Sequence, residues 1–237
     1  MAFLTLNNLL FRQAGWQLEV DARIKKNSCT AIIGPSGAGK STLLSLIAGF
    51  EQLDRGDILI DEQNISVLAP ALRPVTILFQ ENNLFAHLTL RQNVGLGIHP
   101  GLKLSNKDKD RIDHAIATVG LQGLEDRLPN HVSGGERQRA ALARCICQDR
   151  PVLLLDEPFN SLDPALRREM RLLIDQLRRD RGLTVLLVSH NPTEAVEISD
   201  EALFLDHGQI LEHGKLEQLL ENPSTHELAQ YLLYPRK

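Results

Sequence analysis

One stretch decides the fold: Gly34-Pro35-Ser36-Gly37-Ala38-Gly39-Lys40-Ser41-Thr42, which fits the pattern G-x-x-x-x-G-K-[ST] of a phosphate-binding loop. The apolar run Cys29 to Ile33 before it is typical of a strand, and Leu43 to Ala48 after it is typical of a helix. Glycine allows the backbone N–H groups to point inward, and a helix N-terminus adds partial positive charge. We therefore expect this stretch to bind nucleotide phosphates, with Lys40 at the β- and γ-phosphates and Ser41 on Mg²⁺.

The loop alone leaves two questions open. A glycine-rich turn can also bind nothing, although the flanking strand and helix argue against that interpretation. The same loop serves kinases, GTPases and motor ATPases, so it does not identify the reaction.

Composition restricts the class of protein. The chain has 237 residues and a net charge of −4, which gives no basic surface for nucleic acid. Met1 to Phe11 lacks the basic region and cleavage site of a signal peptide, and no apolar run approaches the ~20 residues that span a bilayer. The three cysteines, Cys29, Cys145 and Cys147, are expected to be reduced thiols in a cytoplasmic protein without a metal role.

The order of the predicted elements indicates the fold class. Alternating or fully apolar runs predict strands at Ala2–Leu6, Leu18–Ile24, Cys29–Ile33, Asp57–Ile60, Val75–Phe79, Val152–Leu155, Thr184–Val188, Ala202–Leu205 and Gln209–Glu212. Helices are expected at Leu43–Ala48, Leu90–Val94, after the capping box at Ser105, at Ser133–Cys147, from Asp163-Pro164, from Pro192, and at Lys215–Leu220 and His226–Leu233. This order predicts an α/β fold: a P-loop NTPase (RecA-like) core, 1–80 and 151–237, with an antiparallel β subdomain and an inserted α-helical subdomain, 81–150.

Two acidic residues end a buried strand, in Val152-Leu153-Leu154-Leu155-Asp156-Glu157. Ligands of open α/β sheets bind at the carboxyl ends of the strands. Asp156 suits the Mg²⁺ shell, and Glu157 suits the orientation and deprotonation of an attacking water. The alternative is an ordinary acidic turn.

Two further polar residues end neighbouring strands. Gln80 follows Val75–Phe79, so we expect it to face the metal or the water. His190 follows the strand that begins at Thr184 and is expected to contact the γ-phosphate. A hydrogen-bonded structural histidine is the alternative for His190.

A second glycine pair opens a long helix, in Val132-Ser133-Gly134-Gly135-Glu136. Free N–H groups and the helix dipole make this a second anion site, although a flexible hinge is the alternative. Because the first loop is already a complete phosphate cradle, the second is expected to bind the phosphates of another molecule's ATP. The sequence thus predicts a head-to-tail dimer that encloses two ATP molecules.

This set of motifs resembles the nucleotide-binding subunits of ABC transporters over nearly the whole chain. Gly34–Thr42 is similar to their Walker A loop, Gln80 to the Q-loop, Val132–Glu136 to the signature, Val152–Glu157 to Walker B, Asn160–Asp163 to the D-loop and His190 to the switch histidine. The resemblance implies a single ABC ATPase domain over 1–237. It implies catalytic roles for Glu157, His190 and Gln80, and metal contacts from Ser41, Gln80 and Asp156. It also implies ATP contacts from Phe11, Gly34, Pro35, Ser36, Gly37, Ala38, Gly39, Lys40, Ser41, Thr42, Ser133, Gly134 and Gly135.

The chain departs from the family pattern at four positions. The signature begins with Val132 instead of Leu and ends with Glu136 instead of Gln, and the added carboxylate is expected to weaken ATP closure slightly. Asn160 replaces a small residue in the D-loop, and Phe11 replaces the Tyr that commonly stacks on adenine, which keeps the stacking but loses the hydroxyl.

Three segments resemble the ATPase subunits of bacterial thiamine importers: Pro35–Phe50, Gln80–Thr89 and Gly95–Leu104. The resemblance implies ATP and Mg²⁺ as cofactors, and a homodimer at the cytoplasmic face of the inner membrane. It also implies a membrane permease that docks near Asn82 to His87, and an indirect partner, a periplasmic thiamine-binding protein. The alternatives are an importer ATPase for another small solute, a soluble ABC ATPase acting on DNA or ribosomes, and a non-catalytic nucleotide-regulated adaptor. Acidic charge and the complete set of Lys40, Asp156, Glu157 and His190 argue against the last two.

Overall fold

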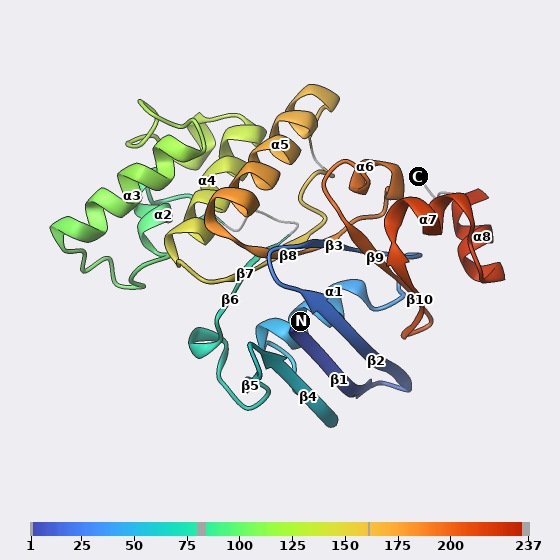
Figure 1. Ribbon diagram of the computed structural model, residues 1–237. Helices are drawn as coiled ribbons and strands as arrows, with labels where there is room; N and C mark the ends of the chain where they lie inside the picture. Colours follow the sequence, from blue (N-terminus) through green and yellow to red (C-terminus); the bar gives the residue numbers. More distant parts are fainter. Residues whose placement is uncertain (1, 80–83, 161, 234–237) are drawn as a thin grey trace.

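A computed structural model describes residues 2–79, 84–160 and 162–233. Its strands are β1 (Ala2–Gln13), β2 (Trp16–Lys25), β3 (Cys29–Ile33), β4 (Arg55–Ile60), β5 (Gln63–Asn64), β6 (Val75–Leu78), β7 (Val152–Asp156), β8 (Thr184–Val188), β9 (Glu201–Asp206) and β10 (Gln209–Lys215). Within the described residues they form one sheet, in the order β5-β4-β1-β2-β10-β9-β3-β8-β7-β6 (Figure 1).

The helices are α1 (Lys40–Ala48), α2 (Leu90–Gly95), α3 (Asn106–Thr118), α4 (Gly134–Cys147), α5 (Pro164–Arg181), α6 (Pro192–Ala195), α7 (Leu216–Glu221) and α8 (His226–Leu233). Short 3-10 turns lie at Pro70–Leu72 and Pro129–His131. No helix in the described part of the chain is long and apolar enough to cross a membrane.

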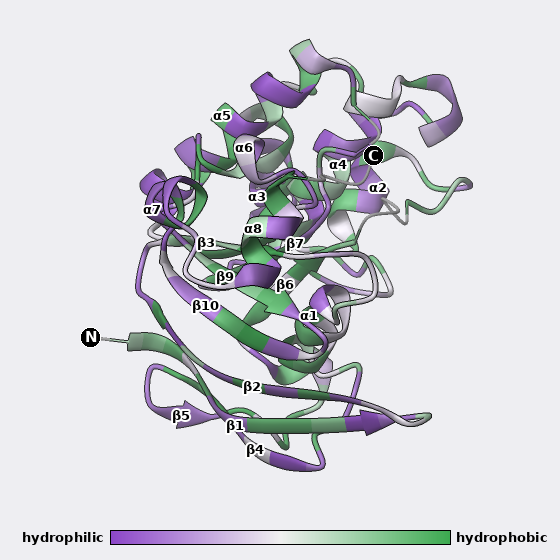
Figure 2. Ribbon diagram, turned by 90° about the vertical axis from the view of Figure 1, so that its right-hand side faces the viewer, coloured by the Kyte–Doolittle hydropathy of each residue, from purple (hydrophilic) through white to green (hydrophobic). Residues whose placement is uncertain are grey.

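One half of the sheet, from β9 to the edge strand β6, is parallel. β3 pairs with β8 and β9, and β7 pairs with β6 and β8, all in the same direction. Every residue of β3, β7 and β8 is buried, which explains why these strands are nearly continuous apolar runs in the sequence. The labelled strand β7 has mostly the hydrophobic colour in Figure 2. Because parallel strands end at one edge, the residues that follow β3, β7 and β8 come together there.

The other end of the sheet, from β5 to β2, is antiparallel, as the alternating patterns of β1 and β2 predict. This part curls so that α1 lies between it and β3 (Figure 1). Leu43, Leu44, Leu46 and Ile47 of α1 are fully buried in one core cluster with the inward residues of β1, β2 and β4. The sheet thereby surrounds the helix that follows the phosphate loop and fixes its direction.

The helices between β6 and β7, which are α2, α3 and α4, lie beside one another on the other face of the sheet, next to α5 (Figure 1). Their apolar stripes join a second core cluster with α5, α7 and α8. Neighbouring residues of β7 alternate between the two clusters, with Leu153 and Leu155 in one and Leu154 in the other. The division into 1–80, 81–150 and 151–237 stays a prediction.

Candidate nucleotide site

The phosphate loop connects the end of β3 to the start of α1. Gly34 has a φ of +148°, and a Cβ there would lie 1.9 Å from the backbone oxygen of Leu205, so only glycine fits. Gly39 has a φ of +107° and a side chain there would collide with Trp16 at 2.8 Å. These two positions require glycine because neighbouring strands crowd the loop, which accounts for the spacing seen in the sequence.

Lys40 lies folded along its own loop. Its Nζ donates hydrogen bonds to the backbone oxygens of Gly34 at 2.9 Å and Pro35 at 2.8 Å. Burial lowers the pKa of Lys40, while the carboxylates of Glu157 and Asp156 act in the opposite direction and favour its charged form. The ammonium group is thus held at the loop, within reach of an anion that the loop would bind.

Ser41 connects the loop to the end of β7. Its Oγ donates a hydrogen bond of 3.0 Å to Oδ1 of Asp156, which is buried. Burial raises the pKa of Asp156 and Glu157 adds to the rise, whereas the bond from Ser41 lowers it. A hydroxyl and a carboxylate are hard oxygen ligands of the kind that Mg²⁺ prefers, so the pair fits that ion.

Glu157 follows β7 in a left-handed conformation with a φ of +47°. Its Oε2 accepts a hydrogen bond from the side-chain amide of Asn160. Nδ1 of His190 lies 3.7 Å from the same oxygen, and the His190 side chain is 49% exposed. Asn160 thus orients the Glu157 carboxylate and His190 faces it, at the edge of the sheet where β7 and β8 end.

These groups surround one cavity of about 1010 Å³. The phosphate-loop residues Gly34, Pro35, Ser36, Gly37, Ala38 and Lys40 line it together with Glu157 and His190. Gly39, Ser41, Thr42 and Asp156 are not in its lining, although Ser41 and Asp156 bond to each other beside it. The remaining lining residues are Trp16, Asn160, Asp206, His207, Glu227, Gln230 and Tyr231.

The structure does not bring Phe11 to this cavity. The Phe11 side chain is 5% exposed and packs in the core cluster around α1, so its ring has no free face for an adenine base. The register of β1 shifts between Leu6 and Leu9, and this irregularity turns Phe11 inward. Trp16, at the start of β2, and Tyr231, in α8, line the cavity instead, and Trp16 lies against Gly39 of the phosphate loop. The place of Trp16 next to a turn (Ala14 and Gly15) is the only sequence signal for it.

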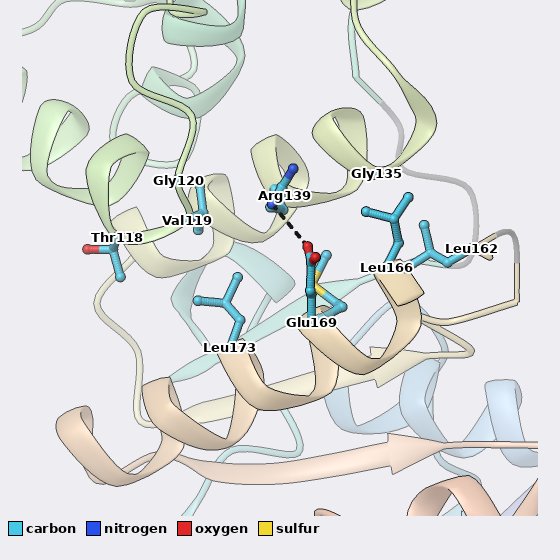
Figure 3. Close-up of a pocket in the computed structure, with 10 residues that line it drawn as sticks. Thr118, Val119, Gly120, Gly135, Arg139, Leu162, Leu166, Glu169 and Leu173 are labelled. Atoms are coloured by element: carbon cyan, nitrogen blue, oxygen red, sulfur yellow. Dashed lines mark ion pairs between the residues drawn. The ribbon is translucent and has the colours of Figure 1, made fainter. Parts of the chain in front are cut away.

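The predicted second anion site opens α4, away from the cavity. Ser133 caps the helix and forms a capping box with Glu136, whose N–H and carboxylate both bond to Ser133. Glu136 therefore takes the role that Gln also fills in a capping box. Gly135 lines a different pocket, of about 230 Å³, between α3, α4 and α5, where Arg139 and Glu169 lie 3.7 Å apart (Figure 3).

Gln80 and residues 81–83 lie outside the described residues, so the predicted roles of Gln80, Asn82 and Asn83 stay predictions. The segment that follows is held by Asn93, which is fully buried. Its Oδ1 accepts a hydrogen bond from the backbone N–H of Phe85 at 2.8 Å, and its Nδ2 donates to the oxygens of Phe85, Leu88 and Thr89. The Phe85 side chain is left 50% exposed.

The parallel sheet and the phosphate loop define a P-loop nucleotide-binding protein. A family model described as ABC transporter matches residues 18–160, and the chain belongs to that family. This confirms the family predicted from the motifs.

Relatives and solved structures agree with that family. The chain is 50% identical over 215 residues to the thiamine import ATP-binding protein ThiQ of Photobacterium profundum, covering 91% of this chain and 89% of the relative. It is 54% identical to ThiQ of Yersinia pestis, covering 86% of this chain and 87% of the relative. The dimeric ATP-binding cassette MJ0796, solved in a post-hydrolysis state with ADP and Pi, has a TM-score of 0.78 and 27% identity, covering 90% of this chain and 98% of that one. The predicted α/β P-loop fold is confirmed.

Proposed function

We propose that this chain is the ATP-hydrolysing subunit of an ABC importer for thiamine. The observation that carries the proposal is the cavity in which the phosphate loop, Glu157 and His190 face one another. Thiamine is proposed from the likeness to the ThiQ proteins, because residues of this chain would not touch the transported solute.

The phosphate loop binds ATP through its backbone N–H groups, and Lys40 exchanges the oxygens of Gly34 and Pro35 for phosphate oxygens. Trp16 stacks on the adenine, since it is an aromatic side chain of the cavity wall that lies against Gly39 of the loop, whereas the Tyr231 hydroxyl is bonded to the backbone of His190. The exchange costs little, because the Lys40 ammonium is already at the loop.

Ser41 and Asp156 hold Mg²⁺, with Gln80 as a further ligand from the segment outside the described residues. When bound, the ion neutralises charge on the β- and γ-phosphates. In the described part of the chain, no group of three or more His, Cys, Asp or Glu side chains could hold a metal ion, so the site depends on phosphate oxygens as well.

Glu157 orients the attacking water and accepts its proton, while His190 contacts the γ-phosphate. Asn160 holds the Glu157 carboxylate in place for that task. The left-handed backbone at Glu157 is consistent with a strained functional position.

Ser133, Gly134 and Gly135 contact the ATP of a second copy in a head-to-tail homodimer. They do not line this chain's own cavity, and the start of α4 offers free N–H groups to an anion. The dimeric state of MJ0796 supports this arrangement.

A membrane permease docks on the segment near Asn82 to His87, at the cytoplasmic face of the bacterial inner membrane. Phe85 and Phe50 are 50% and 54% exposed, and Asn93 fixes the backbone that presents Phe85. A periplasmic thiamine-binding protein is the indirect partner on the other side of the membrane.

Uptake of labelled thiamine by the source cells tests the proposal. Lys40→Ala is expected to abolish uptake while the permease is still present, whereas Lys107→Ala, an exposed lysine of α3, is expected to leave uptake unchanged. Normal uptake with Lys40→Ala, in cells without a second thiamine transporter, would overturn the assignment of thiamine.

A further inference from the structure

Helix α8 forms part of the wall of the nucleotide cavity. Glu227, Gln230 and Tyr231 all line the cavity. These positions are three and four residues apart, so they share one face of the helix. None of the ATP-binding motifs named in the sequence includes this helix.

The start of α8 is fixed to the sheet. Glu212 of β10 accepts hydrogen bonds through Oε1 from the backbone N–H groups of Ser224 and Thr225, at 3.0 and 2.7 Å, and from the Thr225 hydroxyl at 2.6 Å. Leu228 on the inner side of the helix is fully buried. The helix is thus anchored where it begins and along its inner face.

Tyr231 connects the C-terminal part of α8 to the edge of the sheet where β3, β7 and β8 end. Its hydroxyl donates a hydrogen bond of 3.1 Å to the backbone oxygen of His190. Its ring packs on Phe204 of β9, with ring centroids 5.6 Å apart. Burial raises the pKa of Tyr231 to about 12, and a backbone hydrogen bond with Gly34 acts against that rise. The hydroxyl is therefore protonated at neutral pH and can donate.

The two backbones that Tyr231 meets belong to different parts of the site. Gly34 opens the phosphate loop after β3, and His190 follows β8. The His190 imidazole is half exposed and faces Glu157, so its position depends on the backbone that carries it. The hydrogen bond from Tyr231 to the backbone of His190 therefore restricts the position of the imidazole relative to the phosphate loop.

We propose that Tyr231 is a positioning residue for ATP hydrolysis, which holds the backbone of His190 against the phosphate loop. The inference rests on the proposed function, in which His190 contacts the γ-phosphate. In this role Tyr231 acts through the backbone of His190 and takes no chemical part in the reaction itself.

The test measures kcat, the KM for ATP and the melting temperature of the importer complex with four variants: Tyr231→Phe, His190→Ala, the double variant and Leu233→Ala. Tyr231→Phe keeps the ring on Phe204 and removes only the hydroxyl. We expect kcat to fall about three- to tenfold with an unchanged KM, since one hydrogen bond is lost. In the His190→Ala background the same change should have no further effect on kcat. Leu233→Ala, an exposed position of α8, should match the wild type.

The outcomes separate the two proposals. If His190→Ala leaves kcat unchanged, the role of His190 in the proposed function is wrong, and with it the role of Tyr231. If His190→Ala lowers kcat but Tyr231→Phe does not, only the role of Tyr231 is wrong. An equal fall on adding Tyr231→Phe in both backgrounds, or a lower melting temperature without a change in kcat, would assign Tyr231 a purely structural role and overturn the inference.

Discussion

Ser41 and Asp156 are 115 positions apart in the chain, and a hydrogen bond of 3.0 Å joins their side chains. The bond brings the end of the phosphate loop to the end of β7, and it places two oxygen ligands side by side. In the proposed function the Ser41 hydroxyl and the Asp156 carboxylate would hold Mg²⁺ when the nucleotide is bound. The Ser41–Asp156 pair therefore links the phosphate loop to the acidic residues at the end of β7.

Removing either member of this pair should affect metal-dependent turnover. We expect Ser41→Ala and Asp156→Asn to lower kcat about a hundredfold, because a bound metal contributes several kcal/mol to charge stabilisation. The measurement is ATP hydrolysis as a function of Mg²⁺ concentration, with Ser45→Ala of the same helix as the control. Wild-type turnover by Asp156→Asn would contradict the metal assignment.

Trp16 and Phe11 should respond differently to substitution. Trp16→Ala is expected to raise the KM for ATP about five- to hundredfold, since stacking on a base contributes ~1–3 kcal/mol. Phe11→Leu is expected to lower the melting temperature with an unchanged KM, because Phe11 is a core residue. Trp16 is the only tryptophan of the chain, so quenching of intrinsic fluorescence by ATP reports on the stacking directly. Absence of quenching while ATP binds would exclude Trp16 from the adenine site.

Asn160 should matter for turnover and not for binding. Its side-chain amide orients the Glu157 carboxylate, and Asn160→Ala removes that bond. We expect kcat to fall about three- to tenfold at an unchanged KM, with Asn106→Ala on α3 as a matched control. A kcat equal to that of the wild type would show that Glu157 is held by its backbone alone.

Glu212 should make stability depend on pH. Burial raises its pKa, but the hydrogen bonds from Thr225 and Ser224 outweigh burial and hold the pKa below the ordinary 4.5. Because the pKa is lower in the folded than in the unfolded chain, the stabilisation is complete above the unfolded value and is lost as the pH falls through the folded one. Glu212→Gln should therefore lower the melting temperature most near neutral pH, and the difference from the wild type should shrink in acid.

Melting curves from about pH 7 to about pH 3 check this expectation, with Glu217→Gln, an exposed position of α7, as the control. A difference between Glu212→Gln and the wild type that grows on acidification would contradict the direction of the pKa shift.

Local patterns predicted most of the elements. The strands β3, β7 and β8 are continuous apolar runs because both of their faces are covered, and the capping box at Ser105 marks the start of α3 as expected. The ends of the strands were less predictable. β1 runs on to Gln13, well beyond the expected Ala2–Leu6, because its pairing with β2 continues up to the turn at Ala14 and Gly15.

The cavity walls could not be predicted from local patterns. Phe11 faces the core because β1 shifts register between Leu6 and Leu9, and a strict two-residue alternation does not anticipate such a shift. Tyr231 meets His190 from 41 positions away, through a helix whose own sequence carries no nucleotide motif. Contacts of this kind depend on how elements pack and not on the pattern within any one of them.

The role of Glu157 is tested most directly by measuring ATP binding and ATP hydrolysis by Glu157→Gln, compared with Glu217→Gln. The amide keeps the shape of the side chain but cannot accept a proton from water. We expect Glu157→Gln to bind ATP as tightly as the wild type and to lose turnover, whereas Glu217→Gln should be unaffected in both measurements. Brisk hydrolysis by Glu157→Gln would contradict the central claim that Glu157 activates the attacking water in this cavity.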